Sequence, residues 1–175
     1  MQTDHPVVRD HIITLDRYPH LTEDQSLHDA VEAIKSYTHS PEARLAYSEL
    51  FVLDISNHLL VGRARLQDII RGIDSRFNGL GKVGKFEGKK TDVTNLVTLW
   101  GDSFFDECAK SRTKQIREFM SPVQHTVGGS DSLLKALAMM LSANETVLPV
   151  VDNDRVAGVI RLEEIFNAIT NRCRL

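Results

Sequence analysis

The chain is 175 residues long, 42% of them hydrophobic, with a formal net charge of −3 at pH 7. This small net charge excludes the strong basic field that attracts nucleic acid or anionic lipid, so we expect neither as a partner. Two cysteines, Cys108 and Cys173, are too few for a disulfide framework, and we expect reduced thiols. The N-terminus has no signal-peptide pattern and no apolar run is long enough to cross a bilayer, which favours a cytoplasmic protein without membrane contact.

The first part of the chain predicts a strand, a helix, a β-hairpin and a second helix, in that order. A short apolar segment lies around residues 18–21, and "SLHDAVEAI" (26–34) repeats apolar residues at helical spacing after a serine suited to an N-cap. Two β-rich runs separated by polar turn residues, 49–54 and 59–64, are typical of a hairpin. Residues 66–73 return to helical spacing.

A glycine-rich stretch, "NGLGKVGKFEGKK", follows this second helix and contains G-x-G-x-x-G at Gly79, Gly81 and Gly84. That pattern binds dinucleotides where a buried strand leads into a helix N-terminus. Because a helix end precedes these glycines and no apolar run follows them, we interpret the stretch as a flexible connector. Beyond it, "TDVTNLVTLWGDSFFDECAKS" (91–111) is predicted to be partly helical, with its tryptophan and phenylalanines available for packing.

The rest of the chain repeats the first part. A short apolar segment at 125–127 precedes "SLLKALAMM" (132–140), whose apolar residues keep the helical slots of the earlier copy. The runs 147–152 and 156–160 predict a second hairpin. The apolar spacing of residues 162–169 predicts a second helix after it.

The two copies match most closely where each hairpin runs into its second helix. "GVIRLEEIF" (158–166) shares its glycine, arginine and leucine positions with "GRARLQDII" (62–70). One such unit, of about sixty residues, buries little surface alone, whereas two units bury their apolar faces against each other. We therefore expect a first unit at 1–75, a partly helical insert at 76–116 and a second unit at 117–175.

The order of these segments and their amino-acid sequences resemble the cystathionine-β-synthase (CBS) domain, present as a tandem pair. "VRDHIITLDRYPHLTEDQSLHDAVEAI" resembles the family's opening strand and first helix, and "LPVVD" followed by "GVIRLEEI" resembles its later strands and second helix. The resemblance implies an α/β (α+β) fold of two βαββα units, packed pseudo-symmetrically through their sheets. It also implies clefts that in many relatives bind adenosine-containing ligands such as AMP, ATP or S-adenosylmethionine.

Members of this family usually regulate an attached enzyme, transporter or channel and associate in pairs. The two repeats and the insert leave no part of this sequence for such an effector domain. The resemblance therefore implies a stand-alone CBS-domain protein, not an enzyme, that senses an adenine nucleotide and forms a homodimer. Ligand binding would shift the geometry of the module or dimer, and an unidentified regulated protein would respond to that shift. The alternative is a ligand-free structural or interaction module, with its clefts closed by arginine–acid pairs.

The family's ribose- and phosphate-contact pattern is a glycine, two residues, a serine or threonine, two residues and an aspartate. An aspartate carboxylate can accept hydrogen bonds from both ribose hydroxyls. The glutamate of the second copy carries one more methylene group, so its reach differs. The matching positions are Gly62, Arg65 and Asp68 in the first unit and Gly158, Arg161 and Glu164 in the second.

Both copies depart from the family pattern by placing arginine at the serine or threonine position. A guanidinium there could bind a phosphate side-on, which favours AMP, ADP or ATP over the cationic S-adenosylmethionine. Alternatively, Arg65 pairs with Asp68 and Arg161 pairs with Glu164 as ion pairs three residues apart at helix starts. Such pairs would occupy the acid and close the site.

An adenine ring needs an apolar slot, and the resemblance implies one in each unit. Each apolar member of the slot has an alternative role as ordinary core, whereas polar residues at a strand end have less reason to be buried. The implied positions are His20, Leu21, Leu50 and Phe51 in the first unit and Thr126, Val127, Leu148 and Pro149 in the second.

Other chemistry has little support in the sequence. Six of the seven histidines fall within the first 58 residues, but their spacing does not match a zinc site, so we expect no metal. The serines of "GGSDS" suit helix capping and lack a catalytic base. The basic run "KSRTK" (110–114) fits a solvated helix face or a surface for an acidic partner.

Overall fold

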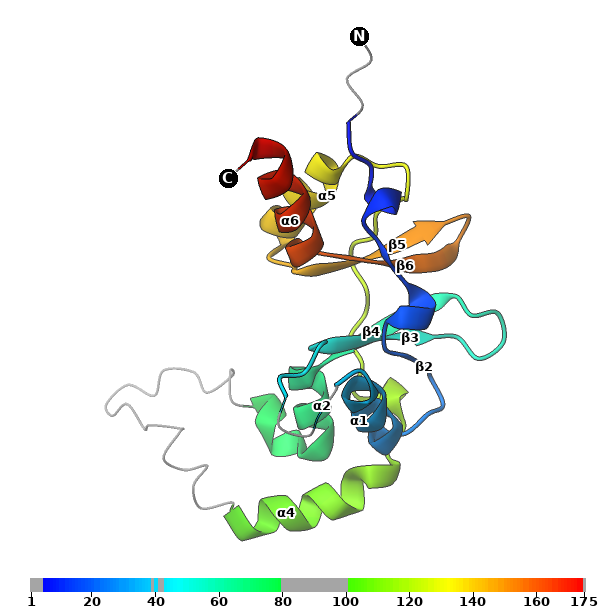
Figure 1. The fold of residues 1–175 in the computed structure, drawn as a ribbon. Coiled ribbons are helices and arrows are strands. Elements are labelled where there is room, and N and C mark those ends of the chain that lie inside the picture. The colour runs from blue at the N-terminus through cyan, green and yellow to red at the C-terminus, as the bar shows by residue number, and fades with distance from the viewer. Residues whose placement is uncertain (1–4, 39, 41–42, 80–100, 175) are drawn as a thin grey trace, which may run out of the picture.

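Two three-stranded sheets face each other across the middle of the molecule, and helices cover their outer faces (Figure 1). The computed structural model describes residues 5–38, 40, 43–79 and 101–174. Each sheet with its two helices corresponds to one copy of the sequence repeat. The expected pair of βαββα units packed through their sheets is thus confirmed.

The first unit consists of β2 (His20–Thr22), α1 (Leu27–Ser36), β3 (Glu49–Leu53), β4 (Leu60–Arg65) and α2 (Leu66–Ile73). Strand β2 lies parallel to β3, and β3 and β4 form an antiparallel hairpin. Both helices lie on the outer face of this sheet (Figure 1). Strand β4 continues into α2 without a loop, and this junction positions the candidate site described below.

The second unit repeats this order with α5 (Leu133–Ala143), β5 (Val147–Asp152), β6 (Arg155–Arg161) and α6 (Leu162–Cys173). In place of a strand like β2, Val127 forms a single parallel bridge to β5. Helices α5 and α6 lie on the outer face of this sheet, on the side of the molecule opposite α1 and α2 (Figure 1). The two sheets therefore share the interior between them.

Each unit is contacted by the segment that precedes the other unit in the chain. We call residues 6–14 and 114–121 the leading segments. In the first, β1 (Ile13–Thr14) pairs antiparallel with β6, and Val8 lies in the core of the second unit. In the second, Ile116 lies in the core of the first unit. This exchange ties the two units together; the exact unit bounds stay a prediction.

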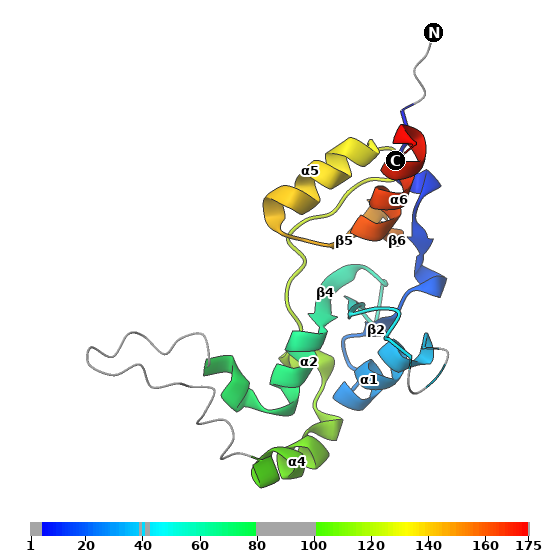
Figure 2. The same ribbon diagram turned by 60° about the vertical axis from the view of Figure 1, so that its left-hand side comes forward.

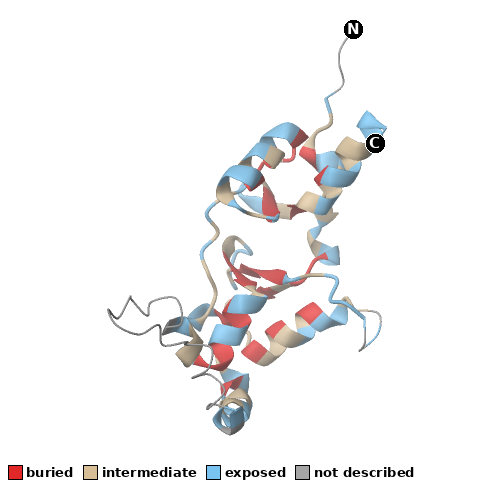
Figure 3. Ribbon diagram, turned by 90° about the vertical axis from the view of Figure 1, so that its left-hand side faces the viewer, coloured by how far each residue is buried: buried red, intermediate tan, exposed pale blue. Residues whose placement is uncertain are grey.

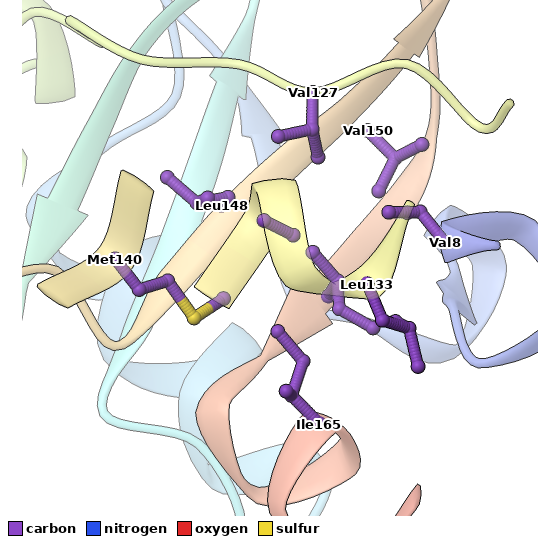
Figure 4. Close-up of a cluster of buried hydrophobic side chains, with 9 residues drawn as sticks. Val8, Val127, Leu133, Met140, Leu148, Val150 and Ile165 are labelled. Carbon is purple, nitrogen blue, oxygen red and sulfur yellow. The ribbon is translucent and has the colours of Figure 1, made fainter. Parts of the chain in front are cut away.

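Side chains alternate between the two faces of each sheet, as strand geometry requires. In the second unit, Leu148 and Val150 point toward the helices and pack with Leu133 of α5 and Ile165 of α6. Val8 of the first leading segment completes this cluster (Figure 4). The first unit has a matching core, and the buried residues follow the sheets and the inner faces of the helices (Figure 3).

The other faces of the two sheets meet at the space that we call the seam. Its apolar part is a buried cluster of Tyr18, Phe51, Val147 and Val159. Burial raises the pKa of Tyr18 far above its usual value because the phenolate cannot be solvated there. Contact through both sheets explains why neither unit is left with an exposed apolar sheet face.

The helix starts agree with the predicted serine caps. The hydroxyl of Ser26 accepts a hydrogen bond from the main-chain N–H of Asp29 (3.2 Å), and the Asp29 carboxylate accepts one from the main-chain N–H of Ser26 (2.8 Å). This reciprocal pair is a capping box, which satisfies two donors that the helix leaves unpaired. Ser132 caps α5 through the main-chain N–H of Lys135 (3.2 Å).

The described end of the insert contains α4 (Gly101–Lys110), which lies beside the first unit and away from the second (Figure 2). The rings of Phe77 and Phe104 meet edge to face, with centroids 5.8 Å apart. The glycines at 81 and 84 and the tryptophan at 100 lie outside the described residues. The short 3₁₀ helices within the described residues are Val8–Asp10, Leu15–Arg17, Ser75–Gly79, Ser111–Thr113 and Ile116–Glu118.

Candidate functional site

Asp68 lies at the junction between β4 and α2. Its Oδ2 atom accepts a hydrogen bond from the main-chain N–H of Arg65, the N-cap residue (3.0 Å). Its Oδ1 atom accepts one from the hydroxyl of Ser121 (3.1 Å) and lies 3.7 Å from a guanidinium nitrogen of Arg71. Asp68 is 6% exposed. A carboxylate is favoured here because the unpaired N–H groups at a helix start carry partial positive charge.

A cavity of about 350 Å³ opens beside Asp68, between α2 and the second leading segment. Arg71 of α2 lines it, together with Lys114, Phe119 and Ser121 of the leading segment. Small-molecule sites typically have volumes of about 300–1,000 Å³, so this cavity is at the small end of that range. The Asp68 carboxylate can accept further hydrogen bonds, because its two oxygens offer about four lone-pair positions.

The charged groups that line the cavity balance one another. Arg71 and Lys114 are opposed by Asp68 and Glu118. The ammonium of Lys114 donates to the main-chain carbonyl of Gly72 (2.9 Å), which places it at the C-terminal end of α2. The lining therefore carries no excess positive charge that would by itself select an anion.

The glycine of each motif allows a leading segment to approach the sheet. A Cβ atom at Gly62 would lie 2.6 Å from the sulfur of Met120 and 3.2 Å from the carbonyl oxygen of Ser121. A Cβ atom at Gly158 would overlap the main-chain carbonyl of Ile13 in β1. Both motif glycines thus have a structural role whether or not a ligand is bound.

The side chain of Arg65 enters the seam rather than lining the cavity. Its guanidinium donates to Oε2 of Glu145 (2.6 Å) and lies 3.4 Å from Oε2 of Glu49. Arg63 donates to the same oxygen of Glu145 (2.9 Å) and to both oxygens of Glu49 (2.7 and 2.6 Å). We call these four residues the seam cluster. Because Glu145 belongs to the turn between α5 and β5, the cluster links the two units.

Most of the seam cluster is hidden from solvent. The side chains of Arg63, Glu49 and Glu145 are 3%, 5% and 12% exposed, whereas that of Arg65 is 40% exposed. Burial raises the pKa of Glu49 above its usual value, and the adjacent Arg63 guanidinium opposes that rise. Buried charges persist where they are paired and hydrogen-bonded, as the charges of Arg63, Glu49 and Glu145 are.

The equivalent junction in the second unit contains an ion pair of its own. Arg161 donates from Nε and Nη2 to the two carboxylate oxygens of Glu164, at 2.8 and 2.6 Å. These bonds raise the pKa of Arg161 above its usual value. The guanidinium also lies over the ring of Tyr47, 5.3 Å from its centroid. The arginine–acid pair considered as an alternative for both units is therefore present in the second, while Arg65 in the first unit pairs across the seam.

Four residues of the predicted adenine slots lie in the helix-side cores. Leu21 and Leu50 are buried in the first unit, and Val127 and Leu148 in the second. Their side chains pack with the helices rather than facing the seam. Contact of these residues with a ligand stays a prediction.

The other four slot residues lie elsewhere. Phe51 faces the seam, and so does Pro149, because its neighbours along β5 point toward the helices. His20 pairs with Phe51 in the sheet, and its Nδ1 atom lies 2.9 Å from the carbonyl oxygen of Tyr18. Thr126 is exposed. The structure thus brings His20 and Phe51 together and leaves Thr126 at the surface.

Sequence reasoning missed the cavity residues Ser121, Arg71 and Lys114. A signal for the first was present, because "VRDHII" (8–13) is similar to "IREFMS" (116–121). This similarity marks the leading segments as part of the repeat. Lys114 was noted only as part of the basic run 110–114, and the position of both cations at the cavity depends on how α2 packs against the second leading segment.

Comparison with known proteins agrees with this architecture. Residues 116–171 match the family model of the CBS domain. The CBS-pair protein CBSX2 from Arabidopsis thaliana is 19% identical, with a TM-score of 0.67 over 98% of this chain and 99% of the other. The chain has the fold of a CBS pair. A comparison with curated protein sequences gives no match.

Two further CBS-pair structures align along nearly the whole chain. CBSX2 in complex with AMP is 20% identical, with a TM-score of 0.63 over 96% of this chain and 98% of the other. A putative acetoin utilization protein (AcuB) from Vibrio cholerae is 15% identical, with a TM-score of 0.64 over 98% and 95%. Within the described residues, the chain has no helix with the length and apolarity needed to cross a bilayer.

Proposed function

We propose that this CBS pair senses an adenine nucleotide in the cavity beside Asp68 and transmits its occupancy to a partner protein. The observation that carries the proposal is the position of Asp68, a buried carboxylate at the start of α2 that lines a cavity of about 350 Å³ beside the Ser121 hydroxyl. CBS domains are typically regulatory modules without catalytic activity. The CBSX2–AMP complex supports an adenine nucleotide as the ligand class.

In the proposed complex, the ribose hydroxyls donate to the free lone pairs of Asp68. Charge-assisted hydrogen bonds of this kind are stronger than bonds between neutral groups. Phe119 and Met120 give the cavity an apolar wall against which a purine ring can pack. Because the lining is charge-balanced, phosphate recognition needs a further cation, which we assign to Arg65. That assignment favours AMP, ADP or ATP over the cationic S-adenosylmethionine.

The signal would pass through a change in module or dimer geometry. The cavity lies between α2 and the second leading segment, and that segment connects the insert to the second unit. A ligand that binds one arrangement of these elements better than another shifts the population toward it. We propose a homodimer of the chain as the form that a regulated protein contacts.

A second candidate function is supported by the second unit. The bidentate Arg161–Glu164 pair already occupies the acid that a ribose would need. If the first unit is also unable to bind nucleotide, the chain is a ligand-free interaction or dimerisation module. We therefore assign the proposed site to the first unit alone.

A thermal-shift panel of AMP, ADP, ATP, NAD and S-adenosylmethionine tests the proposal. A ligand at 100 times its dissociation constant stabilises a protein by about 2.7 kcal/mol. For a chain of this size that corresponds to a rise in melting temperature of about 5–10 °C. We expect this rise with at least one of AMP, ADP and ATP. No shift with any of the five at millimolar concentration would favour the interaction module.

Asp68→Asn and Glu164→Gln then locate the site. The introduced amide keeps an oxygen that can accept the Arg65 N–H bond, so the Asp68→Asn variant is expected to fold, while it loses the charge that holds the ribose. We expect Asp68→Asn to abolish the nucleotide-induced shift and the matched Glu164→Gln to leave it unchanged. The reverse result would move the site to the second unit.

A further inference from the structure

Glu145 occupies an anion site formed by two arginines. Arg63 and Arg65 are two residues apart on β4, so their side chains leave the same face of the strand. One carboxylate oxygen of Glu145 accepts hydrogen bonds from both guanidiniums, at 2.9 and 2.6 Å. Arginines that converge on an oxyanion are a common arrangement for binding phosphate. In this structure the carboxylate of Glu145, a residue of the chain itself, occupies the position that a phosphate would take.

The two arginines are not equally available to a ligand. The side chain of Arg63 is 3% exposed and is also held by Glu49 and by the carbonyl oxygen of Val147 (3.3 Å). The side chain of Arg65 is 40% exposed, and its contact with Glu49 is the longer one, at 3.4 Å. An incoming anion can therefore reach Arg65, whereas Arg63 is enclosed.

Arg65 also adjoins the proposed nucleotide site. Its main-chain N–H is bound to Asp68, the residue assigned to the ribose. Its side chain is long and has several rotatable bonds, so the guanidinium can leave Glu145 for a phosphate that extends from that ribose. The seam cluster contains two arginines and two glutamates, so a phosphate gains a cation only if a carboxylate gives one up.

Building on the nucleotide function above, we propose that Glu145 is an internal competitor for the ligand's phosphate. The phosphate takes the place of Glu145 on Arg65, and Glu145 keeps its bond to Arg63. Glu145 thereby weakens the binding of phosphorylated ligands without affecting adenosine, which has no phosphate. The exchange also breaks the contact between Arg65 and the second unit, so nucleotide binding loosens one link across the seam.

Titration calorimetry with AMP and adenosine on wild-type protein and Glu145→Gln tests this proposal. A neutral amide competes poorly for Arg65, so we expect AMP to bind about tenfold more tightly to the variant, a change of about 1.4 kcal/mol. Adenosine affinity should not change. In the Arg65→Gln background, adding Glu145→Gln should no longer affect AMP binding, which separates competition at Arg65 from a general change in the seam.

Glu163→Gln is the matched control, because it removes the same charge from an exposed position of the second unit. It should leave AMP affinity unchanged, and an equal gain would mean that net charge alone explains the effect. Equal gains for AMP and adenosine, or AMP binding that Glu145→Gln does not alter, would overturn the competitor role while leaving the nucleotide function intact. A lack of AMP and adenosine binding to both proteins would instead overturn the nucleotide function.

Discussion

The two strand-to-helix junctions differ in structure although their sequences align. Arg161 forms an ion pair with Glu164, three residues later in the chain, whereas Arg65 forms one with Glu145 on the other side of the seam. Two features accompany the difference: the acid three residues ahead is longer in the second unit, and across the seam Arg65 meets Glu145 whereas Arg161 meets the ring of Tyr47. Glu164 reaches the guanidinium with both oxygens, while the shorter Asp68 stays on the main-chain N–H of residue 65. The carboxylate of Glu164 is thus paired with a guanidinium, whereas that of Asp68 is bound by a main-chain N–H and by the hydroxyl of Ser121.

Gly158 gives a direct test of the exchanged leading segments. We expect Gly158→Ala to destabilise the protein by about 1–3 kcal/mol, because its Cβ atom would overlap the carbonyl of Ile13 and push β1 away from β6. The measurement is the free energy of unfolding from urea titration. Gly128→Ala is the control, since its Cβ atom would meet its nearest neighbour, a side-chain oxygen of Asp131, at an ordinary 3.6 Å. Equal effects would contradict the account of this contact.

Part of the candidate site could be predicted from sequence. The spacing of Gly62, Arg65 and Asp68 matches the family motif, and the structure places Asp68 at a cavity. The partners of Arg65 could not be predicted, because Glu145 lies 80 residues away and is placed by the packing of the two units. The similarity between residues 8–13 and 116–121 places Ser121 in the repeat, but its contact with Asp68 of the preceding unit depends on packing that the repeat does not show.

Helices and hairpins of both units follow from local pattern, and the capping box of α1 is the clearest case. Hydrogen bonds from the main-chain N–H and hydroxyl of Ser26 lower the pKa of Asp29 below its usual 3.8. A group whose pKa is lower in the folded protein contributes stability above its unfolded pKa and loses it as the pH falls through the folded value. The ionised Asp29 therefore stabilises α1 at neutral pH but not in strong acid.

We expect Asp29→Asn to make the free energy of unfolding less dependent on pH in acid. Between pH 5 and about pH 2, the free energy of unfolding should fall more steeply for the wild type than for the variant. Urea titrations at a series of pH values measure this difference. Asp24→Asn, an exposed acid near the same helix, is the control. If it changes the slope as much as Asp29→Asn does, the capping box is not the source of the effect.

The contacts of the leading segments could not be predicted from local sequence pattern. Each is short, and most of its contacts are with the other unit, so neither periodicity nor propensity indicates its partner. The repeat predicted the two sheets and their four covering helices because each has its own apolar face. It did not predict that residues 6–14 would contact the second unit, since that depends on how the finished units meet.

Besides the exchanged leading segments, two kinds of contact across the seam join the two units. Tyr18 and Phe51 pack with Val147 and Val159 in its apolar part, and the seam cluster provides the ionic part. An apolar contact tolerates small shifts of one sheet on the other, whereas paired charges hold a particular register. A ligand that takes Arg65 from Glu145 would therefore remove one of the ionic contacts between the units.

A crystal structure of the chain with AMP tests the central claim most directly. We predict AMP in the cavity between α2 and the second leading segment, with its ribose hydroxyls within hydrogen-bond distance of Asp68 and its phosphate on Arg65. AMP bound only at the Arg161–Glu164 junction of the second unit, or found away from Asp68, would contradict the account.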